Sequence, residues 1–222
     1  VEDLREKIAK KSPENYEQPY IIGDLIEPGS VVVLVTPIDS AAPKGRLILP
    51  QVQTIRDVLD HEAINIVAKE TELKQALNSL KDDPAMVVTD SQAFKQVDRE
   101  VPDDILMTSF SILFARYKGD LNIYMSGCKK IEELKPESRI LVAEACTHRR
   151  QQDDIGTVKI PRWLRQKTGE GLEFDHVAGR EYPDNLKEYD LILHCGGCML
   201  NRKEILSRLQ EARDEGIPII NY

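Results

Sequence analysis

The feature that most constrains the fold of this chain is an alternation of short β-branched runs with segments of helical periodicity. In the first half the expected strands lie at 31–35, 64–67, 86–89 and 105–108. In the second half they lie at 140–144, 174–177, 191–194 and 217–220. Such alternation is typical of α/β proteins with a mainly parallel sheet. We therefore expect two consecutive α/β domains with mainly parallel sheets, the second of them Rossmann-like.

Two interruptions divide the chain. A periodic segment at 110–117 ends at Gly119, where we place a domain boundary. A short periodic segment at 1–12 precedes a polar linker, and a helix of that size has little to pack against, which indicates the tail of a preceding domain. The predicted parts are a tail with linker at 1–19, a first domain at 20–118 and a second domain at 119–222.

Three apolar helix faces lead to more specific expectations. The face of the segment at 110–117 serves either as a dimer interface or as an ordinary core and comprises Phe110, Leu113, Phe114 and Tyr117. An earlier helix is expected to bury Val52, Ile55 and Leu59. Cys128 shares a face with Tyr124 and Met125, which predicts a buried cysteine.

The composition excludes several function classes. With 30 basic and 38 acidic residues the net charge is −8, and no stretch gathers basic side chains, which argues against nucleic acid as a partner. No apolar run approaches the roughly 20 residues of a membrane span, and the start lacks a signal-peptide pattern, so we expect a cytoplasmic protein without a membrane partner. The 4 cysteines should then stay reduced, which favours thiolate chemistry or metal binding.

Two short motifs contain three of the 4 cysteines and two of the 4 histidines. Cys146-Thr147-His148 follows one expected strand, and His194-Cys195-Gly196-Gly197-Cys198 follows another. The carboxyl ends of parallel strands meet at one edge of a sheet, so the two motifs should converge. The two glycines allow the backbone to fold closely around a metal centre. Asn201, with Glu204 three residues later, predicts that a helix begins just after the second motif.

The residue types leave the metal open. Zinc would bind Cys146, Cys195 and Cys198 together with one histidine, as the Cys3His structural site of an α/β module that serves only for docking. A 4Fe-4S cluster would use the same three thiolates and leave its fourth iron to a weaker ligand. A third possibility is a redox pair of Cys195 and Cys198 that does not need Cys146.

Several neighbouring residues are candidates for supporting roles. The fourth ligand is sought among five residues, some of which could instead hydrogen-bond a sulfur: His148, His194, Asp154, Asp153 and Glu144. Arg149 and Lys159 either attract an anionic guest to the site or are solvated loop charges. We expect no catalytic step from these residues, because the sequence has no P-loop, radical-enzyme cysteine motif, covalent haem motif or Ser/His/Asp set.

Long motifs in the chain closely resemble the HydF family, the GTPase scaffolds that mature iron-iron hydrogenase. The resemblance rests on the segments at 37–51, 108–116, 144–148, 153–156, 158–161 and 194–202. It implies that the tail belongs to an absent GTPase domain, which alone would bind GTP and magnesium. The first domain would then serve dimerisation and the second would bind the cluster.

The resemblance also implies a role and partners. A 4Fe-4S cluster on Cys146, Cys195 and Cys198 would anchor a di-iron precursor as cargo. Two radical S-adenosylmethionine maturases would help to build this precursor, and apo iron-iron hydrogenase would receive it. The resemblance implies a cytoplasmic homodimer that works under anaerobic conditions and whose full-length form hydrolyses GTP.

Overall fold

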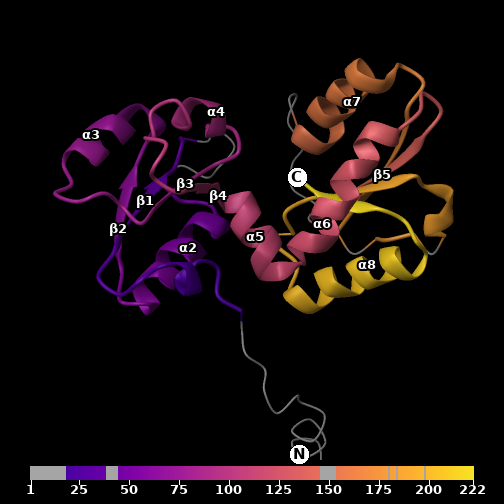
Figure 1. Cartoon of the computed structure of the whole chain (residues 1–222). Coiled ribbons are helices and arrows are strands. Elements are labelled where there is room, and N and C mark those ends of the chain that lie inside the picture. The colour runs from indigo at the N-terminus through magenta and orange to yellow at the C-terminus, as the bar shows by residue number, and fades with distance from the viewer. Residues whose placement is uncertain (1–18, 39–44, 146–153, 180, 184, 198) are drawn as a thin grey trace, which may run out of the picture.

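The computed structural model describes residues 19–38, 45–145, 154–179, 181–183, 185–197 and 199–222. They form two α/β lobes that meet at one helix, α5 (Figure 1). Within the described ranges, every helix is too short or too polar to span a bilayer.

The first lobe contains four strands and four α-helices. The strands are β1 Val31–Val35, β2 Ile64–Ala68, β3 Met86–Thr89 and β4 Met107–Ser109, and the helices are α2 Leu49–Asp60, α3 Leu73–Asn78, α4 Phe94–Val97 and α5 Phe110–Lys118. Short 3-10 turns lie at η1 Gly23–Leu25 and η2 Glu70–Glu72. The fourth strand begins two residues later than predicted, because the Ile105 N–H donates to the Pro102 carbonyl in a turn.

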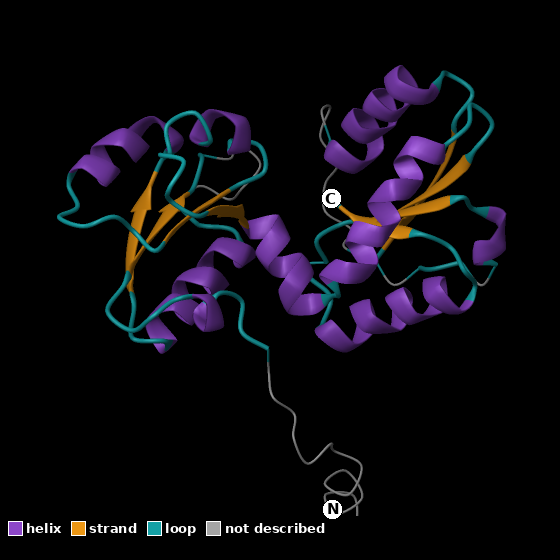
Figure 2. Cartoon of the chain, in the orientation of Figure 1, coloured by secondary structure: helices purple, strands orange, loops and turns teal. Residues whose placement is uncertain are grey.

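The second lobe repeats this plan (Figure 2). Its strands are β5 Arg139–Glu144, β6 Glu173–Ala178, β7 Leu191–His194 and β8 Ile219–Asn221, and its helices are α6 Leu121–Cys128, α7 Ile160–Thr168 and α8 Arg202–Asp214. Three short helical turns complete it: η3 Lys129–Glu133, η4 Ile155–Lys159 and η5 Leu186–Glu188. The η4 turn has π-helical hydrogen bonding and runs directly into α7.

Both sheets are fully parallel and have the same strand order. The first runs β2-β1-β3-β4 and the second β6-β5-β7-β8. In each sheet the chain starts at an inner strand, moves to one edge and returns to the other side, as in doubly wound folds. The prediction of two α/β domains with parallel sheets is confirmed, and the predicted boundary at Gly119 falls between α5 and α6.

Each sheet is buried on both faces, which explains why its inner strands read as nearly continuous apolar runs. In the first lobe Val32 and Leu34 pack toward α2 and α5, while Val33 and Val35 face the opposite layer, to which α3 and α4 contribute. In the second lobe the two layers are divided in the same way, with α8 on one face of the sheet and α7 on the other.

Helix α5 contributes to both hydrophobic cores. Phe110, Leu113 and Phe114 are almost fully buried in the first lobe, whereas Ala115 packs with the α8 side of the second. Three residues of the apolar face seen in the sequence therefore belong to an intramolecular core, and the fourth, Tyr117, is partly buried against it. Ser109 caps the start of helix α5, because its hydroxyl accepts a hydrogen bond from the Ile112 N–H.

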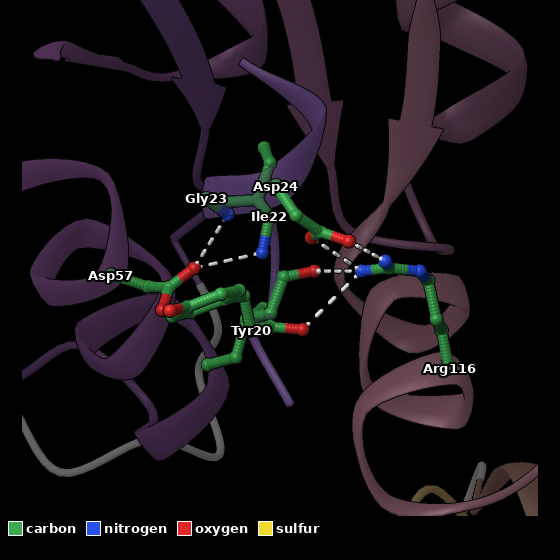
Figure 3. Close-up of polar contacts among 7 residues, drawn as sticks. Tyr20, Ile22, Gly23, Asp24, Asp57 and Arg116 are labelled. Carbon is green, nitrogen blue, oxygen red and sulfur yellow. Dashed lines mark hydrogen bonds and ion pairs between the residues drawn. The ribbon is translucent and has the colours of Figure 1, made fainter. Parts of the chain in front are cut away.

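The segment that enters the first lobe is held by two charged side chains (Figure 3). The Asp57 carboxylate of α2 accepts hydrogen bonds from the Ile22 and Gly23 N–H groups, both at 2.8 Å. From α5, the Arg116 guanidinium forms an ion pair with Asp24 and donates to the Tyr20 carbonyl. These contacts tie the entry segment to both α2 and α5.

Two predicted helix faces are rotated in the structure. Helix α2 buries Gln51, Thr54 and Val58, and of the predicted residues only Ile55 packs against the core, whereas Val52 and Leu59 are exposed. The buried face includes a polar residue, Gln51, because its amide hydrogen-bonds the Asp90 carboxylate.

Cys128 is exposed and not buried as predicted. Helix α6 turns Tyr124 and Gly127 inward instead, since a Cβ on Gly127 would lie 2.3 Å from the Ile219 carbonyl oxygen. The close approach of α6 to β8 depends on that glycine, and this approach decides which face is buried.

Candidate metal centre

The two cysteine motifs follow neighbouring strands of the second sheet. Strands β5 and β7 pair in parallel, with Ala143 opposite His194. This pair is also the switch point of the sheet, because β5 connects outward to β6 on one side and the chain returns to β7 on the other. Doubly wound sheets bind ligands in the crevice at such a point, beyond the carboxyl ends of the strands.

One hydrogen bond joins the two strand ends at the thiol. The Ala145 N–H, directly before Cys146, donates to the Cys195 Sγ at 2.9 Å. The Cys195 N–H in turn donates to the Ala143 carbonyl at 3.0 Å, which extends the strand pairing by one step. The Cys195 sulfur therefore lies against the backbone that leads into the first motif.

Five of the predicted site residues lie outside the described residues: Cys146, His148, Arg149, Asp153 and Cys198. The structure describes the other five: Glu144, Asp154, Lys159, His194 and Cys195. Within the described part of the chain, no group of three or more His, Cys, Asp or Glu residues could hold a metal ion. The prediction of the ligand set thus stays a prediction.

The described part of this edge nevertheless fits a thiolate-held metal group. The Cys195 sulfur accepts a backbone N–H, the kind of contact that stabilises a thiolate ligand. Gly197 has a φ of 61°, and a Cβ there would lie 2.6 Å from Ile205 Cδ1. The cysteine loop (195–200, of which 198 is not described) therefore needs a glycine to close over α8.

His194 uses both ring nitrogens in contacts within the protein. The side chain is buried, with Nδ1 2.6 Å from the Cys195 carbonyl oxygen and Nε2 3.2 Å from an Arg208 guanidinium nitrogen. Arginine can only donate, so Nε2 is the acceptor and Nδ1 carries the proton. Burial lowers the pKa of His194 to about 4, and the Arg208 charge adds to this effect. These contacts favour a positioning role for His194 over a metal-ligand role.

Arg208 is a site residue that the sequence reasoning missed. Its guanidinium is buried, donates to the Gly179 carbonyl at 2.8 Å and lies over the Tyr182 ring. Position 208 falls between Ile205 and Leu209, on the buried face of α8. The sequence did offer one sign of this role, because the arginine occupies a position on the apolar face of the predicted helix. It places a positive charge beneath the strand ends.

The two described carboxylates occupy different surroundings. Glu144 ends β5 and is buried, and a Cβ on Gly156 would lie 3.1 Å from its Oε1 atom. Asp154 Oδ1 accepts from both the N–H and the hydroxyl of Thr157, each at 2.8 Å, and so caps the η4 turn. Lys159 ends that turn and is partly exposed. Glu144 lies at the strand end itself, whereas Asp154 has a capping role.

The cysteine loop is also contacted from the first lobe. Lys118, the last residue of α5, is buried and donates to the Gly197 carbonyl at 2.9 Å and the Leu200 carbonyl at 2.8 Å. Beyond the loop, the Asn201 side chain accepts from the Glu204 N–H at 2.9 Å, which confirms the predicted start of α8. Lys118 had no sequence signal, because it ends an amphipathic helix as many lysines do.

Comparisons with known proteins identify the family. Residues 21–119 match the hydrogen maturase F dimerization domain, and residues 122–222 match the hydrogen maturase F tetramerization domain. No curated protein matches the sequence. Together the two matches cover nearly all of the described residues, in the order that the two lobes follow. The chain belongs to the hydrogen maturase F family, HydF, and is a hydrogenase maturase with two domains of the kind that mediates oligomerisation.

Proposed function

We propose that this chain is the part of a hydrogenase maturase that carries a 4Fe-4S cluster on Cys146, Cys195 and Cys198. The observation that carries the proposal is the 2.9 Å hydrogen bond from the Ala145 N–H to the Cys195 Sγ. It brings the residue that precedes the first motif to the thiol of the second, at the switch point of the sheet. Thiolates are the ordinary ligands of iron-sulfur clusters.

The protein's own groups prepare this edge for a negatively charged guest. The Ala145 N–H stabilises the Cys195 thiolate, and His194 fixes the carbonyl of the same residue. The buried Arg208 guanidinium supplies positive charge beside His194 at the end of β7. Arg149 and Lys159 would add positive charge at its mouth. When bound, the cluster would supply an iron with a replaceable ligand.

For that fourth position we favour His148, Asp153 or Glu144 over His194 and Asp154. His194 uses both ring nitrogens, and Asp154 caps the η4 turn. Glu144 stands at the end of β5, next to the strand end that carries Cys195. A carboxylate or imidazole exchanges more readily than a thiolate, which suits a carrier that must release its cargo.

The wider role follows from the family. We propose that the cargo is a di-iron precursor, that two radical S-adenosylmethionine maturases help to build it, and that apo iron-iron hydrogenase receives it. A full-length protein would add a domain that binds magnesium and hydrolyses GTP. The proposed setting is the anaerobic cytoplasm, and the proposed working form is a homodimer capable of further assembly.

Metal and sulfide analysis of anaerobically reconstituted protein tests the proposal. About four iron and four sulfide per chain, with broad absorption near 400 nm, is the expected result for a 4Fe-4S cluster. Cys146→Ala should lose the iron, while Cys128→Ala, which changes the exposed cysteine of α6, should keep it. One zinc without sulfide would contradict the proposal and favour a zinc-stabilised docking module. A Cys195–Cys198 disulfide that forms reversibly in Cys146→Ala would favour a redox protein.

A further inference from the structure

Helix α5 makes polar contacts with both lobes. Toward the first lobe, Arg116 binds the entry segment through Asp24 and the Tyr20 carbonyl (Figure 3). Two residues later, Lys118 binds the cysteine loop through the carbonyls of Gly197 and Leu200. The same helix also packs Phe114 into one core and Ala115 into the other.

The contact between Lys118 and the loop is buried and specific. Lys118 is 7% exposed, and its Nζ lies 5.5 Å from the centre of the Phe114 ring. A buried amino group must be hydrogen-bonded, and here two of its bonds go to loop carbonyls on either side of position 198. The lysine therefore holds the loop at two points that bracket its second cysteine.

A second set of hydrogen bonds runs in the opposite direction. Arg202, the first residue of α8, donates to the carbonyls of Tyr117 at 3.1 Å and Gly119 at 3.4 Å. These carbonyls lie at the end of α5, where no further helical turn can pair with them. Two basic side chains therefore join these elements. Lys118 donates from α5 to the cysteine loop, and Arg202 donates from α8 to the end of α5.

We infer that Lys118 is a positioning residue for the cysteine loop and that α5 is the element through which the first domain sets the loop's geometry. The inference deepens the proposed function, since it concerns the same metal site, but the contacts on which it rests do not require the metal. A shift of the first domain that moves α5 would shift the hydrogen bonds to Gly197 and Leu200. The loop would then hold its thiols less firmly.

The first test uses metal-free protein, so that its outcome does not depend on the cluster. The rate of alkylation of Cys195 by iodoacetamide is measured by mass spectrometry in the wild type and in Lys118→Met. We expect roughly tenfold faster alkylation in the variant, the factor that corresponds to the loss of one hydrogen bond's contribution to loop stability. Lys203→Met, an exposed lysine on α8, is the matched control and should react at the wild-type rate.

Two further variants keep the test decisive if Lys118→Met does not fold. Lys118→Arg keeps hydrogen-bond donors at the end of α5 and should return the rate toward the wild-type value. Arg202→Gln removes the reciprocal contacts and should also speed alkylation. Equal rates in Lys118→Met and Lys203→Met, or in Arg202→Gln and the wild type, would overturn the inference.

The second test uses the reconstituted protein. Loss of the Lys118 charge beside the loop should lower the midpoint potential of the cluster and alter its electron paramagnetic resonance spectrum, with Lys203→Met unchanged. Identical potentials in the two variants would count against the inference. If the wild type binds no iron at all, the proposed function fails, while the alkylation rates still decide whether Lys118 positions the loop.

Discussion

The two domains share one topology and differ at the ends of their strands. Both have a parallel sheet in which the first strand lies between the second and the third. The residue after β3 is Asp90, and the residue at the matching place after β7 is Cys195. Asp90 accepts a hydrogen bond from the buried Gln51 at 2.7 Å, whereas the Cys195 sulfur accepts the Ala145 N–H.

This difference shows that two domains of one topology can carry different chemical groups at the switch point. In the first domain the switch point carries hydroxyl, amide and carboxylate groups that bond one another, as Ser91 and Ser111 also do at 2.9 Å. In the second domain the same place carries a thiol, a buried histidine and a buried arginine. The fold supplies the crevice, and the first residues beyond each strand supply the chemistry.

The largest expected effect is on iron binding, and it should differ between the two matched positions, Cys195 and Asp90. Cys195→Ala should abolish iron binding after anaerobic reconstitution, because it removes one of three proposed thiolates. Asp90→Ala, at the equivalent place in the first domain, should leave the iron content unchanged. Iron analysis by mass spectrometry measures both. Loss of iron in both variants would mean that the two edges are not functionally distinct.

The buried polar side chains beside each switch point provide the next prediction. Arg208→Met leaves the Gly179 carbonyl and the His194 ring without a buried donor and should lower the free energy of unfolding by about 3 kcal/mol.

Gln51→Leu, the matched change in the first domain, removes an uncharged amide that donates to the Asp90 carboxylate and accepts from the Ile48 N–H, and should cost only about 1–2 kcal/mol. Urea unfolding followed by circular dichroism distinguishes them. A larger loss in Gln51→Leu would show that the first domain depends more on its polar core.

Two glycines with positive φ sharpen the contrast between the domains. Gly197→Ala combines an unfavourable φ of 61° with an atom 2.6 Å from the new Cβ and should destabilise by about 2 kcal/mol. Gly29→Ala has a φ of 80° but open space around it, so about 1 kcal/mol is expected. Thermal unfolding by scanning calorimetry tests this, and equal losses would contradict a closely packed cysteine loop.

The smallest effects on stability should come from two exposed apolar side chains that we propose as contacts in assembly. Leu59 of α2 is 55% exposed and Trp163 of α7 is 51% exposed. Leu59→Glu should weaken the dimer and Trp163→Glu the tetramer, each changing the protomer's own stability by less than about 0.5 kcal/mol. Sedimentation velocity reports the species. An unchanged distribution in both variants would exclude these surfaces as interfaces.

Much of the fold could be predicted because local patterns determine it. Short β-branched and apolar runs marked six of the eight strands to within one residue at each end, while β4 and β8 begin two residues later than predicted, and Asn201 marked the start of α8. The convergence of Cys195 with the segment before Cys146 followed from parallel strand ends alone. The spacing of apolar residues and the parallel topology were sufficient to predict these features.

The remaining features depend on packing that no local pattern encodes. Cys128 is exposed because Gly127 lets α6 approach β8 closely and so rotates the helix. The role of His194 depends on Arg208, which lies on a different element and satisfies Nε2. Lys118 could not be recognised from sequence, because its partners are backbone carbonyls of another domain.

Iron anomalous diffraction from anaerobically reconstituted crystals tests the central claim most directly. A 4Fe-4S cluster on the second domain predicts one strong iron peak per chain, bonded to the Cys195 Sγ at the carboxyl ends of β5 and β7. A peak at the β1 and β3 ends of the first domain would contradict this account. The account would also be contradicted if the predicted site gave an anomalous peak at the X-ray absorption edge of zinc and none at that of iron.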